Sequence, residues 1–343
     1  LFVCCIIKLM NLDTAIDTFL SPIADKISGI IFSSVTIQGV KVEFLVALLM
    51  IAAFYFTIRT RFIGIWGFKH ALKLITKNYE HKEIRVKKKK GEVSSFQALT
   101  ATISASAGIG NVAGSAAAVS IGGPGVIFWM ILAGFFSMAL KFAEVLLGLK
   151  FRKINPDGTI AGGPMYYIEG ALKNNKYIGK FAPHLSKIYA VCCIFAMIGG
   201  WNLFQINAMT TQITEVTGGN NSFFANQSWL LGLIVAVITY FTIIGGIKAI
   251  GKFTSKVTPV MCTLYVLTAF AVCIYNIGHV PHTFALIVKE AFHPKALAGG
   301  MFACMLWGFR RAMFANEAGL GTAPIAFSAV KTNNPVAQAF IAM

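Results

Sequence analysis

Long stretches that are poor in charged residues constrain this chain more than any other feature. They are 42–58, 99–120, 126–149, 188–214, 229–247, 257–276 and 297–327, and a further one begins near residue 336. A bilayer core about 30 Å thick needs about 20 apolar residues, because a helix rises about 1.5 Å per residue. Only 13% of the residues are charged, against about 25% in soluble domains. We therefore predict an all-α polytopic membrane protein with about seven spans and the start of an eighth.

We call 99–120 span 1, so that 126–149 is span 2, 188–214 is span 3 and 297–327 is span 6. The run that begins near residue 336 stops at Met343. A span cannot end inside the bilayer with its carbonyls unpaired, so we expect a C-terminal truncation. Residues 1–39 are expected to form an N-terminal extracytoplasmic amphipathic segment with one or two interfacial helices. Residues 40–343 are expected to form the transmembrane domain, which is incomplete.

The basic residues indicate how the spans are oriented. The chain has 30 Lys and Arg against 13 Asp and Glu, a net charge of +17. They gather in alternate loops, 59–90, 152–187 and 248–256, whereas 121–125 and 215–228 contain none. Cytoplasmic loops carry such an excess, so we expect the basic loops to face the cytoplasm of a cell membrane. The run Lys87–Lys90 could instead bind nucleic acid or anionic lipid; a topology signal is the favoured interpretation.

A glycine-rich stretch in span 1 resembles a phosphate-binding loop. Residues 108–113, "GIGNVA", fit the pattern G-x-G-x-x-G/A of dinucleotide enzymes. That function needs a preceding strand and an acidic residue about 20 positions later, but the first acid after the stretch is Glu144. Glycine in mid-span instead lowers helix propensity by about 1 kcal/mol relative to alanine. We therefore expect span 1 to be broken at Gly108, Gly110 and Asn111, although close helix packing could also explain Gly114.

Span 6 is the other span that is expected to be interrupted. It contains Gly308, Gly319, Gly321 and Pro324, together with Arg310, Arg311, Asn316 and Glu317. Spans 1 and 6 lie five apart and would run in opposite directions, as an inverted repeat of five plus five spans requires. Broken helices at matching positions of two halves indicate a transporter site. Their free N–H groups suit a carboxylate and their free carbonyls suit an ammonium group or Na⁺. A small zwitterion carried with a cation is the expected substrate class.

Five motifs carry a resemblance to a known family. They are "FQALTATISASAGIGNVAGSAAAVSIGGPGVIFWM", "LKFAEVLLGLKFR", "GTIAGGPMYYIEGAL", "GGIKAIGKFTSKVTPVM" and "LWGFRRAMFANEAGLGTAPIA". From about residue 40 onward the chain resembles the alanine or glycine:cation symporter family. The resemblance implies a leucine-transporter-like inverted-repeat fold with broken helices 1 and 6. It also implies Na⁺-coupled symport of alanine or glycine by alternating access, and no enzymatic activity or cofactor.

The resemblance further implies which residues form the site. From span 1, Gly108, Gly110 and Asn111 would bind the substrate. Ser104, Ala107 and Asn111 of the same span would bind Na⁺. The remaining substrate contacts would come from spans 3 and 6: Gln205, Asn207, Trp307, Gly308 and Phe309. In span 6 the break is expected at 307–309, with the two aromatic rings walling a small pocket. Gln205 and Asn207 are two residues apart and so do not share a helix face.

Other charged residues and other functions were weighed as well. Lys141 and Glu144 are three apart in span 2 and are expected to pair or to line the inner path. We expect Arg310, Arg311 and Glu317 to form a structural or gating ion network. "GGPMYYI" (162–168) is expected to be a short surface helix. The alternatives are a passive channel, which would need a continuous polar path, and an H⁺-driven symporter of another small solute.

Overall fold

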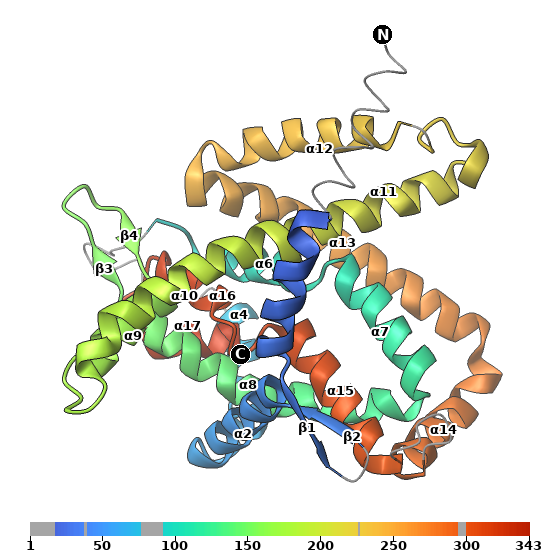
Figure 1. The fold of residues 1–343 in the computed structure, drawn as a ribbon, viewed down its shortest axis with the longest axis horizontal. Coiled ribbons are helices and arrows are strands. Elements are labelled where there is room, and N and C mark those ends of the chain that lie inside the picture. The colour runs from blue at the N-terminus through green and yellow to red at the C-terminus, as the bar shows by residue number, and fades with distance from the viewer. Residues whose placement is uncertain (1–17, 38–39, 77–91, 226, 294–299) are drawn as a thin grey trace.

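The chain folds mostly into helices (Figure 1). A computed structural model describes residues 18–343, apart from 38–39, 77–91, 226 and 294–299. The prediction of a helical fold is confirmed, with two small antiparallel sheets in addition. In one, β1 (Ser34–Ile37) pairs with β2 (Val40–Glu43), and in the other β3 (Lys153–Ile154) pairs with β4 (Ile160–Ala161). The basic run 87–90 lies outside the described residues.

The helices follow the predicted charge-poor runs. In chain order they are α2 (Phe44–Arg59), α3 (Ile63–Trp66), α4 (Phe68–Thr76), α6 (Ser95–Ser106), α7 (Ile109–Gly122), α8 (Gly125–Lys150), α9 (Pro164–Leu172), α10 (Ala182–Ala196), α11 (Phe204–Val216), α12 (Ser228–Ile243), α13 (Gly246–Tyr275), α14 (Val280–Phe292), α15 (Gly300–Asn316), α16 (Thr322–Ser328) and α17 (Pro335–Ala342). A π-helical segment, Met197–Leu203, joins α10 to α11. Short 3₁₀ turns at Gly179–Phe181, Gly219–Asn221 and Ile277–His279 lead into or out of the longer helices. The expected surface helix at 162–168 is present as α9.

Two of the described helices, α8 and α13, are long and apolar enough on their own to cross a membrane, and α2 and α12 are shorter apolar helices. The remaining predicted spans are divided. Span 1 consists of α6 and α7, span 3 of α10, the π-helical segment and α11, and span 6 of α15 and α16. Uninterrupted helix length does not identify these three, because each is divided near its middle.

The N-terminal segment is only partly helical. Residues 18–31 are helical, but the chain then enters the β1–β2 hairpin, which leads directly into α2. Alternating polar and apolar residues had suggested helix throughout 10–38, and the strand was missed. The predicted boundary between residues 39 and 40 falls at the start of β2. Residues 1–17 lie outside the described part, and the extracytoplasmic location of 1–39 stays a prediction.

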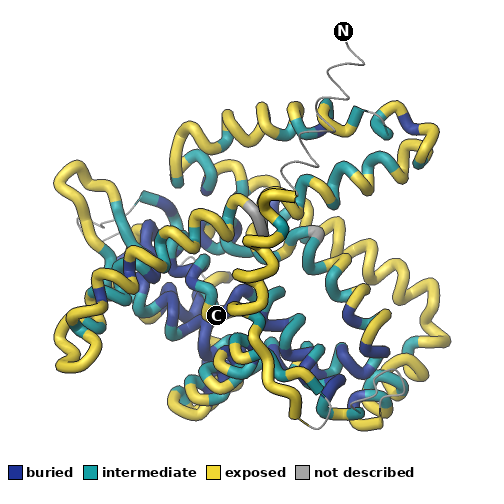
Figure 2. Tube along the Cα trace, in the orientation of Figure 1, coloured by how far each residue is buried: buried dark blue, intermediate teal, exposed yellow. Residues whose placement is uncertain are grey.

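Helix α8 lies at the centre of the packed core. It contacts α2, α14, α15, α16 and α17. Buried apolar side chains form two clusters along it, one around Phe142 and Phe327 and the other around Trp129 and Phe309. Figure 2 shows the buried residues concentrated along these helices, whereas α10 to α13 are largely exposed. Within the apolar window of α13 only 6% of residues are buried, so these faces suit contact with lipid or with further helices.

The close packing of α15 on α8 predicts that a larger side chain at Gly308 destabilises the protein. A Cβ added to Gly308 would lie 2.5 Å from Cβ of Trp129 and 3.0 Å from the carbonyl oxygen of Val126. Overpacking costs about 1–3 kcal/mol, more than the roughly 1 kcal/mol that alanine gains over glycine in a helix. We expect Gly308→Ala to lower the melting temperature of the detergent-purified protein. The control is Gly232→Ala in α12, where nothing lies within 4 Å, and it should melt at or above the wild-type temperature. Equal stability of Gly308→Ala and wild type would contradict the packing argument.

Candidate functional site

The break in span 1 is confirmed. Helix α6 ends at Ser106 and α7 begins at Ile109, so Ala107 and Gly108 are non-helical. Gly108 has φ −80° and ψ 175°, an extended conformation that any residue can adopt. Its glycine is needed for another reason, because an added Cβ would collide with the side-chain amide of Gln205. A Cβ on Gly110 would similarly press on the ring of Phe204, at 3.1 Å. The two glycines therefore let α11 of span 3 pack closely against the break in span 1.

Span 6 is also broken, but not where it was expected. Helix α15 continues to Asn316 and α16 starts at Thr322, so residues 317–321 are non-helical. We call these residues the 317–321 segment. Glu317, Gly319 and Gly321 have positive φ values of 51°, 84° and 84°. Two of the three are glycines, which adopt this conformation at little cost. The pattern G-L-G was the sequence feature that marked the break.

The expected break at 307–309 is wrong, because these residues are helical. Gly308 is buried where α15 meets α8. Phe309 is 1% exposed and stacks near the rings of Phe54 and Trp129. The ring of Trp307 lies under the guanidinium of Arg310, 5.3 Å away. Packing against α2 and α8 explains Gly308 and Phe309. The resemblance had implied instead that the rings of Trp307 and Phe309 wall a small pocket.

The two broken spans pack side by side in opposite directions. The second half of span 1, α7, contacts the first half of span 6, α15, while α6 contacts α16. At one end, the residues before α6 meet those after α16: the amide of Glu92 donates to the carbonyl of Ala329 at 2.7 Å, and that of Lys331 to the carbonyl of Val93 at 2.9 Å. The two breaks therefore lie near one another, between two antiparallel pairs of half-helices.

Asn111 joins the two breaks. Its Nδ2 donates to the carbonyl of Ser106 at the end of α6 and to the carbonyl of Ala315 near the end of α15, the latter at 3.1 Å. Its Oδ1 accepts a hydrogen bond from Arg311 at 3.0 Å. Both amide hydrogens are thus engaged, and Oδ1 retains one acceptor position. At this residue the side chain can therefore accept from an ammonium group or ligate a cation.

Arg311, from α15, contacts the start of α7. Its guanidinium donates to the carbonyl of Gly110 and to Oδ1 of Asn111. It lies against Gly114, where an added Cβ would collide with it. The sequence alone did not indicate this contact. Gly114 is thus a packing residue, as the alternative interpretation of the glycine cluster allowed.

The expected network of Arg310, Arg311 and Glu317 divides into separate contacts. Arg310 pairs with Glu43 at 2.9 Å, whereas Arg311 contacts span 1. The carboxylate of Glu317 accepts a hydrogen bond from the hydroxyl of Thr322 at 2.6 Å. Arg310 thus connects span 6 to β2 and Arg311 connects it to span 1, whereas the bond between Thr322 and Glu317 lies within span 6. These separate contacts differ from the one network that their proximity in sequence had suggested.

A cavity of about 710 Å³ opens beside the two breaks. Its lining comes from α6, α7, α11, α13, α15 and the residues next to them: Ser106, Ala107, Gly108, Asn111, Val112, Ser115, Gln205, Met261, Cys262, Tyr265, Val266, Ala315 and Asn316. None of these lining residues carries a charged side chain. Three side-chain amides and the hydroxyls of Ser106, Ser115 and Tyr265 supply the polar groups. Such a cavity can hold a neutral or zwitterionic ligand whose charges meet backbone groups.

Some of the remaining candidate residues line the cavity and others do not. Gln205 lines the cavity and lies against Gly108. Asn207 is exposed on another face of α11, where its carbonyl accepts from the hydroxyls of Thr210 and Thr211, both at 2.9 Å. Ala107 borders the cavity, whereas Ser104 lies one turn earlier in α6 and is half-buried. The predicted site did not include Asn316, Ser115 or Tyr265. The packing of α13 and α15 brings Tyr265 and Asn316 to the break, whereas Ser115 lies one turn after Asn111 on α7, and this spacing could have indicated it.

The contact between Arg311 and span 1 predicts that loss of this side chain destabilises the protein. Hydrogen bonds to charged groups contribute about 1.5–3 kcal/mol, so Arg311→Ala should lower the melting temperature in detergent distinctly. Arg59→Ala, an exposed arginine at the end of α2, serves as the matched control and should change stability by less than about 1 kcal/mol. If both variants melted alike, Arg311 would not be fastening the two breaks together.

Comparison with known proteins gives concordant results. The model of the sodium:alanine symporter family matches residues 28–343. The sodium/alanine symporter AgcS of Methanococcus maripaludis is 37% identical over 301 residues, which are 88% of this chain and 63% of that protein. The probable sodium/glutamine symporter GlnT of Bacillus subtilis is 32% identical over 300 residues, 87% of this chain and 58% of that protein. The amino-acid carrier protein AlsT of the same species is 31% identical over 300 residues, with shares of 87% and 59%.

The chain spans less than two-thirds of the length of each of these three relatives. The family match nevertheless covers nearly all of it, and the relatives exceed 30% identity over most of the chain. Membership implies a multi-pass protein of the cell membrane, from a family of transporters and not of enzymes. With its two broken, antiparallel spans and a cavity lined by uncharged groups, this chain belongs to the sodium:alanine symporter family.

Proposed function

We propose that this protein carries a small neutral amino acid, alanine or glycine, into the cytoplasm together with Na⁺ by alternating access. The observation that carries this proposal is the meeting of two helix breaks at a cavity without charged lining residues. A zwitterion needs two opposite charges to be met, and helix ends supply both without charged side chains. The names of the relatives support a sodium-coupled amino acid carrier.

Each end of the substrate has a candidate partner. The start of α7 presents free N–H groups, which suit the carboxylate. The carbonyls near the end of α6, at Ser104 and Ala107, together with Oδ1 of Asn111, suit Na⁺ or the ammonium group. Gln205, Gly108 and Gly110 complete the proposed contacts around the cavity. The exposed Asn207 and the packed residues Trp307, Gly308 and Phe309 have no role in the proposed site.

The proposed architecture is the leucine-transporter-like inverted repeat. Its support is the antiparallel packing of α6 on α16 and of α7 on α15. Alternation of basic and non-basic loops supports placing the basic loops in the cytoplasm. Such a repeat allows one pair of broken spans to rock against the remaining helices around a central site.

The transport assignment is tested in proteoliposomes that contain the full-length protein. We expect uptake of labelled alanine when Na⁺ is more concentrated outside than inside. No concentrative uptake should occur when Na⁺ is equal on both sides. Glycine and glutamine as unlabelled competitors identify the preferred side chain, since a relative is named for glutamine. A proton gradient that drove uptake without Na⁺ would favour the H⁺-driven alternative, and uptake indifferent to both gradients would exclude symport.

Asn111 provides the matching test of the site. Because its Oδ1 retains one acceptor position beside the break, Asn111→Ala should weaken the binding of Na⁺ and of alanine together. A change of about tenfold in each apparent Kd corresponds to one charge-assisted hydrogen bond. Asn276→Ala is the control, because Asn276 is exposed at the end of α13 and its amide bonds only the carbonyl of Val272. Unchanged isotherms for Asn111→Ala, measured by calorimetry, would place the site elsewhere.

A further inference from the structure

The 317–321 segment contains backbone groups that the helices on either side cannot satisfy. At membrane depth no water replaces the missing hydrogen bonds, so irregular backbone persists only where protein groups satisfy it. Glu317 also has a φ of 51°, a conformation that costs about 1–3 kcal/mol for a residue other than glycine. Something outside the segment must therefore hold it.

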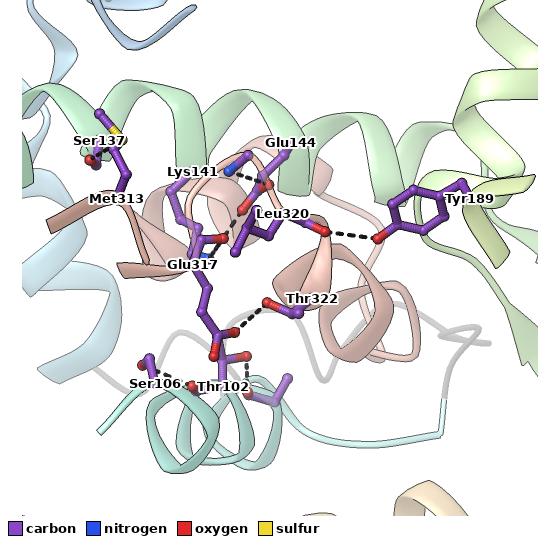
Figure 3. A network of polar contacts seen from close by, with 12 residues as sticks. Thr102, Ser106, Ser137, Lys141, Glu144, Tyr189, Met313, Glu317, Leu320 and Thr322 are labelled. Carbon is purple, nitrogen blue, oxygen red and sulfur yellow. Dashed lines mark hydrogen bonds and ion pairs between the residues drawn. The ribbon is translucent and has the colours of Figure 1, made fainter. Parts of the chain in front are cut away.

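Two side chains of α8 meet the segment directly. Lys141 donates from Nζ to the carbonyl oxygen of Glu317 at 3.2 Å, and Oε2 of Glu144 accepts from the amide of Gly319 at 3.0 Å. The predicted pair of Lys141 and Glu144 is confirmed, with Nζ 3.1 Å from Oε1 and both side chains nearly buried. Figure 3 shows the two side chains reaching from one face of α8 to this segment. A cation thus meets a carbonyl at the end of α15, and a carboxylate meets a free N–H.

The rest of the segment is held from other directions. The hydroxyl of Tyr189, from α10, donates to the carbonyl of Leu320 at 2.8 Å, opposite α8 (Figure 3). Thr322 donates to the carboxylate of Glu317 at 2.6 Å, and this carboxylate points toward α6, where Thr102 and Ser106 lie (Figure 3). The segment is therefore tied to α8, α10 and the start of α16, and α8 supplies both charged partners.

The segment is continuous with one wall of the cavity. Ala315 and Asn316, immediately before it, line the cavity. The carbonyl of Ala315 also accepts a hydrogen bond from Asn111 at 3.1 Å. A shift of the segment would therefore move the cavity wall and the partner of the residue proposed to bind the cation. Neither Lys141 nor Glu144 lines this cavity. Lys141 borders a separate hollow of about 270 Å³ with Ser106 and Asn316, and the contact of both side chains with the backbone of the segment links them to the cavity wall.

We propose that Lys141 and Glu144 are positioning residues, which hold the 317–321 segment and, through it, the cavity wall at Ala315 and Asn316 in the geometry that binds Na⁺ and substrate. The proposal rests on the proposed function for its effect on transport. Its structural part, the immobilisation of the segment, is independent of what is transported. The two parts therefore have separate measurements.

The test removes both charges together, because a lone buried charge would be strongly destabilising whatever its role. Lys141→Met/Glu144→Met loses both contacts to the segment and keeps a similar volume. Lys141→Met/Glu144→Gln retains an acceptor for the amide of Gly319 and serves as the rescue variant, which also carries the test if the first variant aggregates. The matched control is Glu43→Met/Arg310→Met, which removes another ion pair, of 2.9 Å, that ends on α15 but does not touch the segment.

Two readouts are compared in the full-length protein. In hydrogen–deuterium exchange, amides of residues 316–322 should exchange about tenfold faster or more in the double-Met variant. The rescue variant should be intermediate and the control equal to wild type. In proteoliposomes the apparent KM values for Na⁺ and alanine should rise together by about tenfold in the double-Met variant, and by less in the rescue variant. The control should keep the wild-type KM values.

The outcomes separate the two proposals. Unchanged exchange in both α8 variants would overturn the immobilisation of the segment by α8. Faster exchange with wild-type KM values would overturn the positioning role, because the pair would then serve stability alone. A wild-type protein without Na⁺-dependent uptake would overturn the proposed function instead, and the exchange measurement would still show whether α8 holds the segment.

Discussion

The need to satisfy backbone groups at membrane depth is the constraint on which the rest of this structure depends. Two spans are broken, and each break frees N–H and carbonyl groups that lipid cannot meet. Span 1 solves this with Asn111 and Arg311, which bond the carbonyls of Ser106 and Gly110. Span 6 solves it with Lys141, Glu144 and Tyr189, which bond the groups of Glu317, Gly319 and Leu320. The unusual polar residues of these spans are therefore partners of the backbone first, and Oδ1 of Asn111 in addition keeps one acceptor position.

This arrangement accounts for a cavity beside the breaks without charged lining residues. The buried Lys, Arg and Glu side chains are engaged with the breaks from outside the cavity, while amides, hydroxyls and helix ends face it. A neutral amino acid bears both charges itself, and fixed helix ends can meet them without bringing a further charge into the membrane. Span 6 can therefore contain several charged residues inside the membrane, because the side chains of Arg310, Arg311 and Glu317 bond other protein groups and do not line the cavity.

Several parts of the fold and the site could be predicted because they depend on local chemistry. Runs of apolar residues predicted the helices, mid-span glycines predicted a break in each of two spans, and the i, i+3 spacing predicted the pair Lys141–Glu144. Other parts depend on which helices pack together. The break of span 6 was placed at Trp307–Phe309, where the glycine instead lets α15 approach α8, and the contact of Arg311 with Asn111 joins residues 200 positions apart. The hairpin was missed because the alternation of polar and apolar residues in 10–38 was assigned to helix, although Ser34–Ile37 and Val40–Glu43 alternate with the period of a strand.

By itself the sequence determined that this protein is helical and membrane-embedded, which two spans are broken, and which family it belongs to. These follow from composition, from the conformational freedom of glycine and from motifs in order along the chain. Only the tertiary structure decided which backbone groups each polar side chain satisfies, and therefore which residues remain available to a ligand. Gly110 and Gly308 show the difference, because the two glycines look alike in sequence. One admits Phe204 beside the cavity and the other admits Trp129 into the core, since their surroundings are set by helices distant in sequence.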